Sequence, residues 1–371
     1  MKPIITHIST VHPVFDTRIF HKECCSLVEN GFNVNLVITH SKNEIISGVN
    51  IIALPQLRNR LLRILLNPWL AFIKALKTKA DIFHFHDPEL ILIGIFLRLF
   101  GKKVIYDVHE DVPSQILNKR WIPKPIRKIT ALCIKFIEII GSKFFSGIVT
   151  ATPYIENIFK KRNHNTINVN NYPLLKEGTL LIPSDKERNA ICYVGSITKE
   201  RGIIELITAL EGTNIKLYLA GKFVSKLLQD EVKILKGWAN VAYLGVLNRE
   251  QVQDLFKKSM IGICTLHKTP SYNHSLPVKV FEYLNAGLTV IASDIPYWQE
   301  TFKKSQAIEF VDPNCSADIC KKLLSLLSNP QALFERGELG KKYVLENYTW
   351  NSEFQKMLNL YNKAITNKSR L

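Results

Sequence analysis

The sequence of 371 residues has few cysteines and no CxxC pair among them. Its seven cysteines are odd in number and stand mostly among apolar residues, which indicates buried, reduced thiols rather than a disulfide framework. Long hydrophobic runs are also lacking, because the longest nearly uncharged stretch, 90–97, is far shorter than the roughly 20 residues of a membrane-spanning helix. The first residues contain no run that suits a signal peptide. We therefore expect a protein of a reducing compartment, soluble or peripheral to a membrane.

Acidic residues are in deficit: 32 stand against 49 lysines and arginines, a net charge of +17. Such a surplus favours anionic partners such as acidic lipid headgroups, nucleic acid or phosphorylated small molecules. Hydrophobic residues make up 46% of the chain. This share excludes a disordered or collagen-like protein, and at roughly 150 residues per domain the length predicts two large domains.

Short apolar runs alternate with helix-like stretches along the whole chain. The runs predict strands at 4–9, 33–38, 81–86, 104–108, 147–151, 166–169, 190–194, 216–220, 241–244, 261–265 and 289–292. The principal helices are expected at 17–29, 57–79 (split in two at Asn67-Pro68), 88–99, 126–142, 202–210, 251–258 and 277–285, and in the tail from 316. This alternation predicts an α/β protein, made of two doubly wound, Rossmann-like domains whose parallel sheets face a central cleft.

A polar stretch with two prolines, 172–184, separates the two halves. It places an N-terminal domain at 1–174 and a C-terminal domain at 175–371, although the last helix could pack back on the N-terminal domain. In doubly wound sheets, ligands bind beyond the carboxyl ends of the strands. Candidate site residues are therefore expected in the loops that follow the strands.

The loop after the first strand contains no glycine, whereas a dinucleotide-binding Rossmann site would carry GxGxxG there. This absence disfavours a nicotinamide enzyme. The loop ends in Asp16-Thr17-Arg18, and Asp16 has two interpretations. It is either the N-cap of the following helix, which is the commoner case, or a site residue.

Two later strands of the first half end in histidine and acidic residues. His84 and His86 share one face of their strand, a spacing that could seed a metal site. No other cluster at ligand spacing accompanies them, so no metal is predicted, and the alternative is that His86 and Asp87 line the cleft. His109 is either a general base or hydroxyl-binding group, or a hydrogen-bonded loop histidine.

Strand ends in the second half carry cations. The segment from Gly195 to Gly202 joins a strand to a helix and includes Arg201, and both helix N-termini and arginine side chains bind phosphate. Lys279 and Glu282 stand three residues apart, hence on one face of a helix. They form either a surface ion pair or a site in which Lys279 meets phosphate while Glu282 accepts hydrogen bonds from ribose.

Together, these segments resemble the retaining, sugar-nucleotide-dependent glycosyltransferases of family 4, group 1 type, of the bacterial surface-polysaccharide class. The resemblance implies the two-domain GT-B fold and runs along the whole chain. It rests on the order and spacing of the motifs VHPVFDTRIFHKE, DIFHFHDPEL, VIYDVHEDVP, YVGSITKERGI, LAGK, YLGVL and PVKVFEYLNAGLTVIASD.

The resemblance also implies roles for particular residues. As catalytic residues, His109 would reach the donor sugar, Arg201 would contact the donor diphosphate and Glu282 would bind the ribose. The implied donor-binding residues are Gly195, Ser196, Arg201, Gly202, Val246, His274, Lys279 and Glu282. The implied acceptor-side residues are Asp16, Arg18, His86 and Asp87.

Three positions depart from the family pattern. His274 stands in place of a glutamate that reads donor-sugar hydroxyls, Ser196 in place of an arginine, and the loop ending at Arg18 in place of a glycine pair. These departures leave Arg201 and Lys279 as the main diphosphate cations and indicate specialisation. The implied mechanism places the UDP- or GDP-sugar on the C-terminal domain and the acceptor on the N-terminal one. Arg201 and a helix N-terminus stabilise the leaving group, with no metal or other cofactor and no protein nucleophile.

Basic residues concentrate in two stretches of the first half, 45–80 and 112–137, each with a tryptophan. Such stretches suit helices on an anionic membrane, or ordinary amphipathic helices with solvated basic faces. No motif for reading nucleic acid accompanies them, so no nucleic-acid partner is expected.

We therefore predict a cytoplasmic glycosyltransferase, peripheral at the inner face of the membrane. It would transfer a hexose or related sugar to a lipid-linked or polysaccharide acceptor, for a surface polysaccharide such as lipopolysaccharide. Two alternatives are a sugar-nucleotide epimerase on the same fold and a catalytically silent, membrane-associated scaffold.

Overall fold

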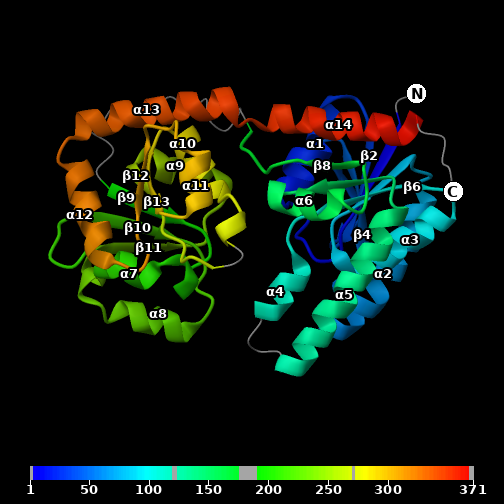
Figure 1. Cartoon of the computed structure of the whole chain (residues 1–371), viewed down its shortest axis with the longest axis horizontal. Helices are drawn as coiled ribbons and strands as arrows, with labels where there is room; N and C mark the ends of the chain where they lie inside the picture. Colours follow the sequence, from blue (N-terminus) through cyan, green and yellow to red (C-terminus); the bar gives the residue numbers. More distant parts are fainter. Residues whose placement is uncertain (1–2, 119–122, 175–189, 270–271, 367–371) are drawn as a thin grey trace. The chain divides into compact units, whose positions relative to one another are not determined.

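The computed structural model describes residues 3–118, 123–174, 190–269 and 272–366 (Figure 1). The chain divides into two α/β units. The first comprises residues 1–171 together with 350–371, and the second comprises 172–349. The predicted fold class, two Rossmann-like domains with parallel sheets, is confirmed. The division falls at Asn171–Tyr172, and the C-terminal unit ends at Thr349 rather than at 371 because the last helix belongs to the first unit.

The sheet of the first unit has the strand order β3-β4-β2-β1-β5-β6-β7-β8 and is parallel except for the β3–β4 hairpin. The order runs outward in opposite directions from β1 and β5, so these two strands form the switch point, where doubly wound sheets bind ligands. The strands are β1 (Ile4–Ile8), β2 (Asn33–Thr39), β3 (Glu44–Ile46), β4 (Val49–Leu54), β5 (Ile82–Phe85), β6 (Lys103–Val108), β7 (Gly147–Thr150) and β8 (Thr166–Asn168).

The helices of the first unit depart from the sequence prediction in several places. The helix at 153–160 was not among those expected, and the helix expected at 17–29 begins as a π-helix. Pro68 lies inside a single helix, α2, and buried Asn67 donates a hydrogen bond to the Pro55 carbonyl instead of capping a second helix. The elements are η1 (a π-helix, Thr17–Cys24), α1 (Cys25–Glu29), α2 (Arg60–Lys77), η2 (Pro88–Leu90), α3 (Ile91–Leu99), α4 (Val112–Asn118), α5 (Lys124–Phe144), α6 (Pro153–Lys160) and α14 (Trp350–Thr366).

The two faces of the first sheet are chemically different. One face is apolar, and Phe83 and Phe85 pack there with buried residues of α2, α3 and α6. The opposite face carries the buried polar side chains of His7, His84 and Asp107, which interact with η1 and α14. Buried polar groups need partners, so this face depends on the elements that cover it.

The second unit has a fully parallel sheet of order β11-β10-β9-β12-β13-β14 with an apolar core on each face. Its switch point lies between β9 and β12, whose loops carry most of the predicted donor residues. The strands are β9 (Ala190–Val194), β10 (Lys216–Ala220), β11 (Val241–Gly245), β12 (Ser259–Cys264), β13 (Thr289–Ser293) and β14 (Ile308–Val311). The helices are η5 (Lys199–Arg201), α7 (Ile203–Thr208), α8 (Lys226–Lys233), η6 (Lys236–Asn240), α9 (Arg249–Lys257), η7 (Tyr272–His274), α10 (Val278–Asn285), α11 (Pro296–Thr301), α12 (Ser316–Leu327) and α13 (Pro330–Asn347).

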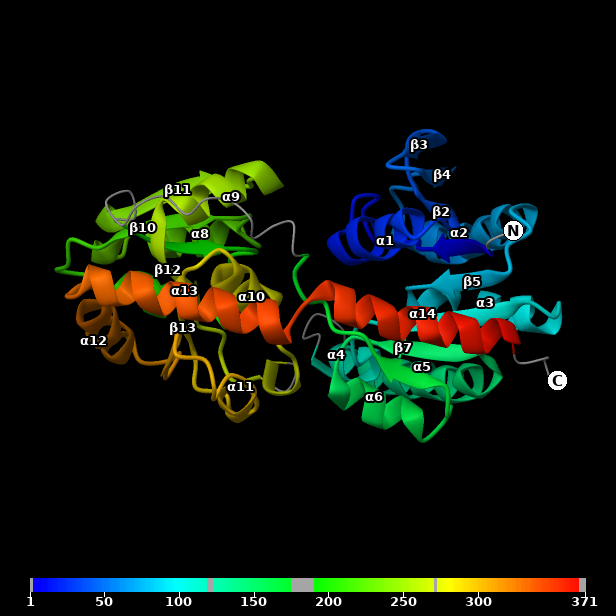
Figure 2. The ribbon, with the colours of Figure 1, turned by 90° about the horizontal axis from the view of Figure 1, so that it is seen from above.

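The last helix, α14, completes the first unit, along whose sheet it lies in Figures 1 and 2. Trp350 is fully buried and donates from its indole N–H to Ser26 Oγ (2.8 Å). Glu353 accepts the backbone N–H of Asn170 (2.8 Å), and Leu360 packs so closely on Gly147 that a methyl group there would lie 2.8 Å from it. These contacts fix α14 over the polar face of the sheet.

Replacing Trp350 by alanine should lower the free energy of unfolding of the first unit by about 3–5 kcal/mol, because it removes a buried indole and leaves a cavity. Urea titration followed by circular dichroism measures the change. The matched control is Trp69→Ala on α2, where the side chain is 49% exposed and the expected loss is about 1 kcal/mol or less. Equal losses in the two variants would contradict the anchoring role of Trp350.

Candidate active site

Three neighbouring strands of the second sheet, β9, β10 and β11, end in glycines with positive φ: Gly195 (138°), Gly221 (144°) and Gly245 (68°). The turns are packed backbone to backbone. Gly195 N–H donates to the Ala220 carbonyl (3.0 Å), and a methyl group on Gly221 would lie 1.8 Å from the Gly195 carbonyl oxygen. Only glycine allows this approach, which opens the strand ends to a ligand.

Two cationic side chains converge on Gly195. A methyl group at this position would lie 3.0 Å from Arg201 Nη1 and 3.3 Å from Lys279 Nζ. Lys279 Nζ is buried 4.0 Å from the centre of the Tyr193 ring and has no hydrogen-bond partner among the described residues. A buried ammonium group without an acceptor is costly, so this place favours an anion.

Arg201 is held by aromatic hydroxyl groups. Burial tends to lower the pKa of Arg201, but its interactions with Tyr193 and Tyr272 outweigh this and raise it. The hydroxyl of Tyr193 itself donates to the Ser196 carbonyl (2.7 Å). The two tyrosines were not foreseen as site residues, although Tyr193 stands in the YVGSITKERGI motif. Their contacts orient the guanidinium beside Gly195.

The other predicted donor residues lie at the same end of the second sheet or on α10. Glu282 is half-buried on α10, one turn after Lys279. Gly202 serves packing, since a methyl group there would lie 2.1 Å from the Thr265 carbonyl oxygen at the end of β12. The remaining three predicted donor residues are exposed and follow β9, β11 and β12: they are Ser196, Val246 and His274. The structure therefore brings Gly195, Arg201 and Lys279 together.

In the first unit, His109 follows β6 and is partly exposed. Its Nε2 atom lies 3.0 Å from Asp107 Oδ2 and 3.3 Å from His86 Nδ1, and its ring stands 5.0 Å from that of His12. His109 is therefore the outer member of a buried polar network. Burial is also the main reason that the pKa of His86 falls to about 4, which keeps this side chain neutral at pH 7.

Two acceptor-side predictions need correction. Arg18 is buried: its Nε and Nη2 donate to the two oxygens of Asp107 (3.0 Å each), and Nη1 donates to the Val169 carbonyl. Its guanidinium is thus occupied within the fold. Asp16 accepts the N–H groups of Arg18 and Ile19, so it is the N-cap of η1.

His86 and Asp87 are also buried, so the prediction that they line a ligand cleft is wrong for their side chains. Asp87 accepts hydrogen bonds from the Thr10 N–H (2.6 Å) and the Ser9 hydroxyl (2.8 Å), and lies 2.9 Å from His12 Nδ1. Burial tends to raise the pKa of Asp87, but these partners lower it to about 2. Asp87 therefore fixes the loop after β1 and holds His12 near His109.

Two groups of histidine and carboxylate side chains in the first unit lie close enough to hold a metal ion. One comprises His7, Glu23, His84 and His86, and the other comprises His86, Asp107 and His109. The first group joins two strands and η1, which the sequence spacing of His84 and His86 alone could not indicate.

The first unit also contains a cavity of about 480 Å³ between α4, α5 and α6. One of its lining residues is Asp111, two residues after His109 in the sequence. Its lining combines apolar side chains with Lys128, Lys135 and Arg162. Burial raises the pKa of Glu138 in this lining to about 7, although Arg162 partly opposes the rise. The cavity can therefore receive a molecule with apolar and anionic parts.

The sheet order and the glycine-ended strands define the second unit as a Rossmann-like domain, with two cations at its switch point. Residues 182–343, which lie within this unit, match the family model "Glycosyl transferases group 1". A curated relative is the uncharacterized glycosyltransferase MJ1607 of Methanocaldococcus jannaschii, 26% identical over 184 residues, which are 48% of this chain and 46% of the relative. The chain spans about half the length of the curated relatives it matches.

Solved structures show the same overall fold. Sucrose-phosphate synthase from Thermosynechococcus elongatus matches with a TM-score of 0.77 and 16% identity, covering 98% of this chain and 99% of that one. HepE of Anabaena, in complex with UDP-glucose, matches with a TM-score of 0.73 and 12% identity, covering 97% and 99%. The chain therefore has the GT-B fold of these proteins.

Replacing Glu138 by glutamine should change how stability depends on pH. The pKa of this carboxyl is about 7 in the folded chain and about 4.5 when exposed, so the unfolded state releases the proton first as pH rises. The wild-type protein should then lose about 3 kcal/mol of stability between pH 4.5 and above 7. Glutamine carries no charge, so the variant should be the more stable protein at pH 8 and no more stable at pH 4. Urea titrations at several pH values test this, and parallel profiles would contradict it.

Proposed function

We propose that this protein is a retaining glycosyltransferase, which transfers a sugar from a UDP- or GDP-sugar to a lipid-linked or polysaccharide acceptor. The observation that carries the proposal is the pair of cations at Gly195. One of them is Lys279, whose Nζ atom is buried and has no hydrogen-bond partner among the described residues. The pair lies at the switch point of the domain that matches the group 1 glycosyltransferase model.

In this proposal the donor diphosphate occupies the space beside Gly195. Arg201 can bind two phosphate oxygens through its planar guanidinium, and Lys279 adds a second positive charge. Negative charge grows on the diphosphate as the bond to the sugar breaks. Both cations are already in place, so they stabilise the leaving group without reorganisation.

Two further residues complete the proposed reaction. Glu282, on the same helix as Lys279, accepts hydrogen bonds from the ribose hydroxyls, and His109 of the first unit contacts the donor sugar. The proximity of His109 to Asp107 supports this role, because the carboxylate fixes the orientation of the imidazole. A uridine donor is supported by the similarity to HepE, whose structure holds UDP-glucose.

Substitutions at the donor site should separate catalysis from binding. Arg201→Ala should lower kcat by about 100- to 1,000-fold, because it removes charge stabilisation of the leaving group. Glu282→Ala should weaken nucleoside diphosphate binding by about 10- to 100-fold, because it removes charged hydrogen bonds to ribose. Calorimetry with UDP and GDP, and turnover of the sugar nucleotide that binds, measure both effects.

The matched control is Lys199→Ala. Lys199 stands in the same short helix, η5, but is paired with Glu231 on the surface, so turnover should stay within about twofold. Normal turnover in Arg201→Ala together with normal nucleotide affinity in Glu282→Ala would refute the site.

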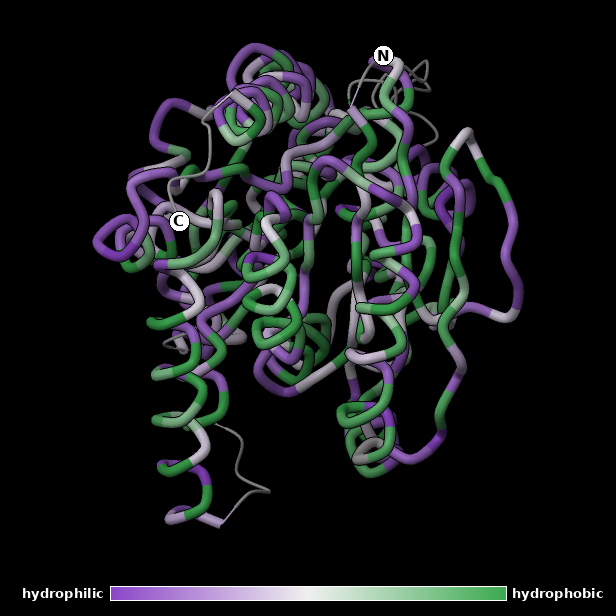
Figure 3. Tube along the Cα trace, turned by 90° about the vertical axis from the view of Figure 1, so that its right-hand side faces the viewer, coloured by the Kyte–Doolittle hydropathy of each residue, from purple (hydrophilic) through white to green (hydrophobic). Residues whose placement is uncertain are grey.

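For the acceptor, we propose a lipid-linked or polysaccharide molecule of surface-polysaccharide synthesis, such as lipopolysaccharide, presented at the inner face of the membrane. The support is an exposed apolar surface on the first unit. On α5 it comprises Ile126, Ile129, Leu132, Phe136 and Ile140, and on α2 it comprises Leu62, Leu65, Leu66, Trp69 and Ile73. In Figure 3 the helix that reaches lowest, α5 by its place in Figure 1, carries hydrophobic residues interspersed with hydrophilic ones.

Charge complementarity argues for a membrane at this surface. Lys124, Arg127, Lys128 and Lys135 lie on α5 among the apolar residues, and the cavity of the first unit is lined by α5 together with α4 and α6. Basic, apolar helix faces of this kind bind anionic bilayers. In the part of the chain that the structure describes, no helix is long and apolar enough to cross a bilayer.

Replacing Leu132 and Phe136 together by serine should weaken binding to phosphatidylglycerol-containing vesicles by about 10-fold or more, because both side chains (68% and 62% exposed) insert apolar area. Co-sedimentation measures the binding. Leu227→Ser is the control, since Leu227 is 77% exposed but lies in the second unit. If the double variant sediments like wild type, or if Leu227→Ser weakens binding as much, this surface is not the membrane contact.

A further inference from the structure

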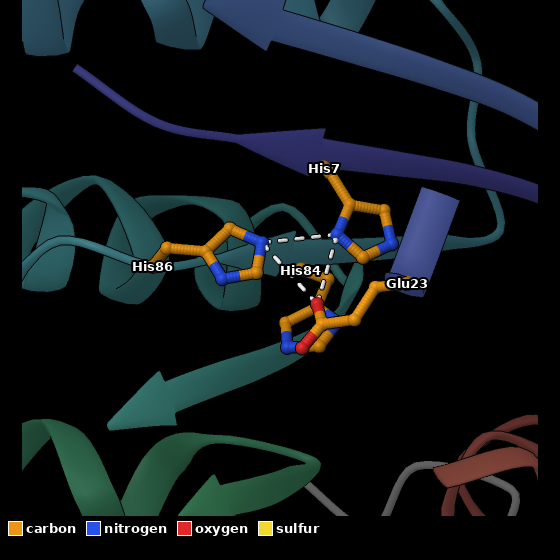
Figure 4. Close-up of side chains that lie close together, drawn as sticks. All are labelled: His7, Glu23, His84 and His86. Atoms are coloured by element: carbon orange, nitrogen blue, oxygen red, sulfur yellow. Dashed lines mark hydrogen bonds and ion pairs between the residues drawn. The ribbon is translucent and has the colours of Figure 1, made fainter. Parts of the chain in front are cut away.

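Four buried side chains meet beneath the first sheet (Figure 4). His7 stands on β1, opposite His84 of β5 in the strand register. His86 follows β5 on the same face, and Glu23 reaches the group from η1. One ligand atom from each of the four lies within 4.8 Å of all the others.

From this cluster we infer a zinc-binding site in the first unit, with His7, His84, His86 and Glu23 as its ligands. Three imidazoles and one carboxylate are a donor set that suits zinc, whereas calcium and magnesium prefer oxygen ligands. Nothing in the proposed sugar transfer requires this site, so the two proposals stand independently.

Three of the ligand atoms are spaced closely enough to share one ion. His7 Nδ1 lies 3.0 Å from His86 Nε2, while Glu23 Oε2 lies 3.6 Å from the first atom and 3.8 Å from the second. The two longer separations exceed hydrogen-bond length. Two atoms bound to one tetrahedral zinc at about 2.0–2.1 Å lie about 3.3 Å apart, close to the middle of this range.

Unsatisfied polar atoms supply the second observation. Glu23 Oε2 and His84 Nε2 are buried and have no hydrogen-bond partner among the residues that the structure describes. Glu23 Oε1 lies 3.0 Å from Arg18 Nε, which offsets only part of the cost of burying the carboxylate. A cation bound by Oε2 and by His84 Nε2 would satisfy both orphaned atoms.

In each histidine, the ring nitrogen that is not a proposed ligand atom lies near a polar side chain, as is usual in metal sites. His84 Nδ1 is hydrogen-bonded to Tyr361 Oη (2.6 Å), and His86 Nδ1 faces Asp107 Oδ2 (3.2 Å). The same tyrosine lies 3.5 Å from His7 Nε2. A ligating histidine usually donates its second ring N–H to such a carboxylate or polar group, which fixes the orientation of the ring.

The ion would join elements that are distant in sequence: β1, η1 and the end of β5 directly, and α14 through Tyr361. Because the ligands are buried, the ion would bind as the unit folds. His86 contacts both the proposed ion and Asp107, the carboxylate that orients His109. The zinc site would therefore be a structural site that joins these elements in the interior of the first unit.

Metal analysis of the whole chain tests the inference. Protein produced in zinc-containing medium and dialysed free of loose metal should carry about one zinc per chain by plasma mass spectrometry. Protein produced with cobalt should show the intense visible absorption of tetrahedral Co²⁺. Wild-type protein that carries neither metal would overturn the proposal without any variant being needed.

Variants then assign the ligands. His84→Ala and Glu23→Gln should lose the metal, and Tyr361→Phe, which keeps all four ligands, should bind it about 10- to 100-fold more weakly. The control is His267→Ala, a histidine of the second unit that is paired with Glu205. Circular dichroism establishes which variants fold. Full zinc content in a folded His84→Ala, or an unchanged cobalt affinity in Tyr361→Phe, would refute the site.

Discussion

The first unit depends on the buried ion pair between Arg18 and Asp107. The guanidinium reaches Asp107 on β6 through two hydrogen bonds and Val169, after β8, through a third. Leaving one charge of such a pair without its partner costs several kcal/mol, so η1 cannot separate from the sheet without a large penalty. The same carboxylate orients His109, which makes the candidate catalytic residue and the core parts of one network.

The two sheets bury different kinds of side chains on their faces. The second sheet has apolar clusters on both faces, as expected for parallel strands between helices. The first sheet has one apolar face and one face with histidines and carboxylates. Buried polar groups of this kind require exact partners, which come from η1 and α14 rather than from neighbouring strands. Rigidity at the first switch point therefore comes from polar contacts, whereas the second switch point is shaped by glycine turns and two cations.

Much of the fold could be predicted because parallel strands are continuous apolar runs. The strand at 216–220 was located at its observed bounds. The edge hairpin was missed: β3 has only three residues, and the apolar run 51–54 of β4 was not assigned to a strand. The cap predicted at Asn67-Pro68 was wrong because Asn67 instead contacts the Pro55 carbonyl, 12 residues earlier in the sequence. Local patterns carry no information about such contacts.

In the candidate site, too, contacts between residues close in sequence could be predicted, whereas contacts between distant residues could not. The loop near Gly195 could be found from one motif, because glycine, arginine and the strand end are close in sequence. Arg18 was assigned to the acceptor because sequence gives no sign that Asp107, 89 residues later, occupies its guanidinium. The group of His7, Glu23 and His84 was missed for the same reason: its members become neighbours only through strand pairing and the seating of η1.

The position of α14 has a consequence for the order in which the chain is made. The second unit is one continuous segment, 172–349, and its synthesis is complete before that of Trp350 begins. The first unit lacks the helix that covers its polar face until residue 366 has emerged from the ribosome. His84 therefore has no hydrogen bond to Tyr361 while the second unit is being synthesised. The domain that begins first is thus the one that finishes last, and a chain that stops before α14 would leave a histidine-rich surface open to solvent.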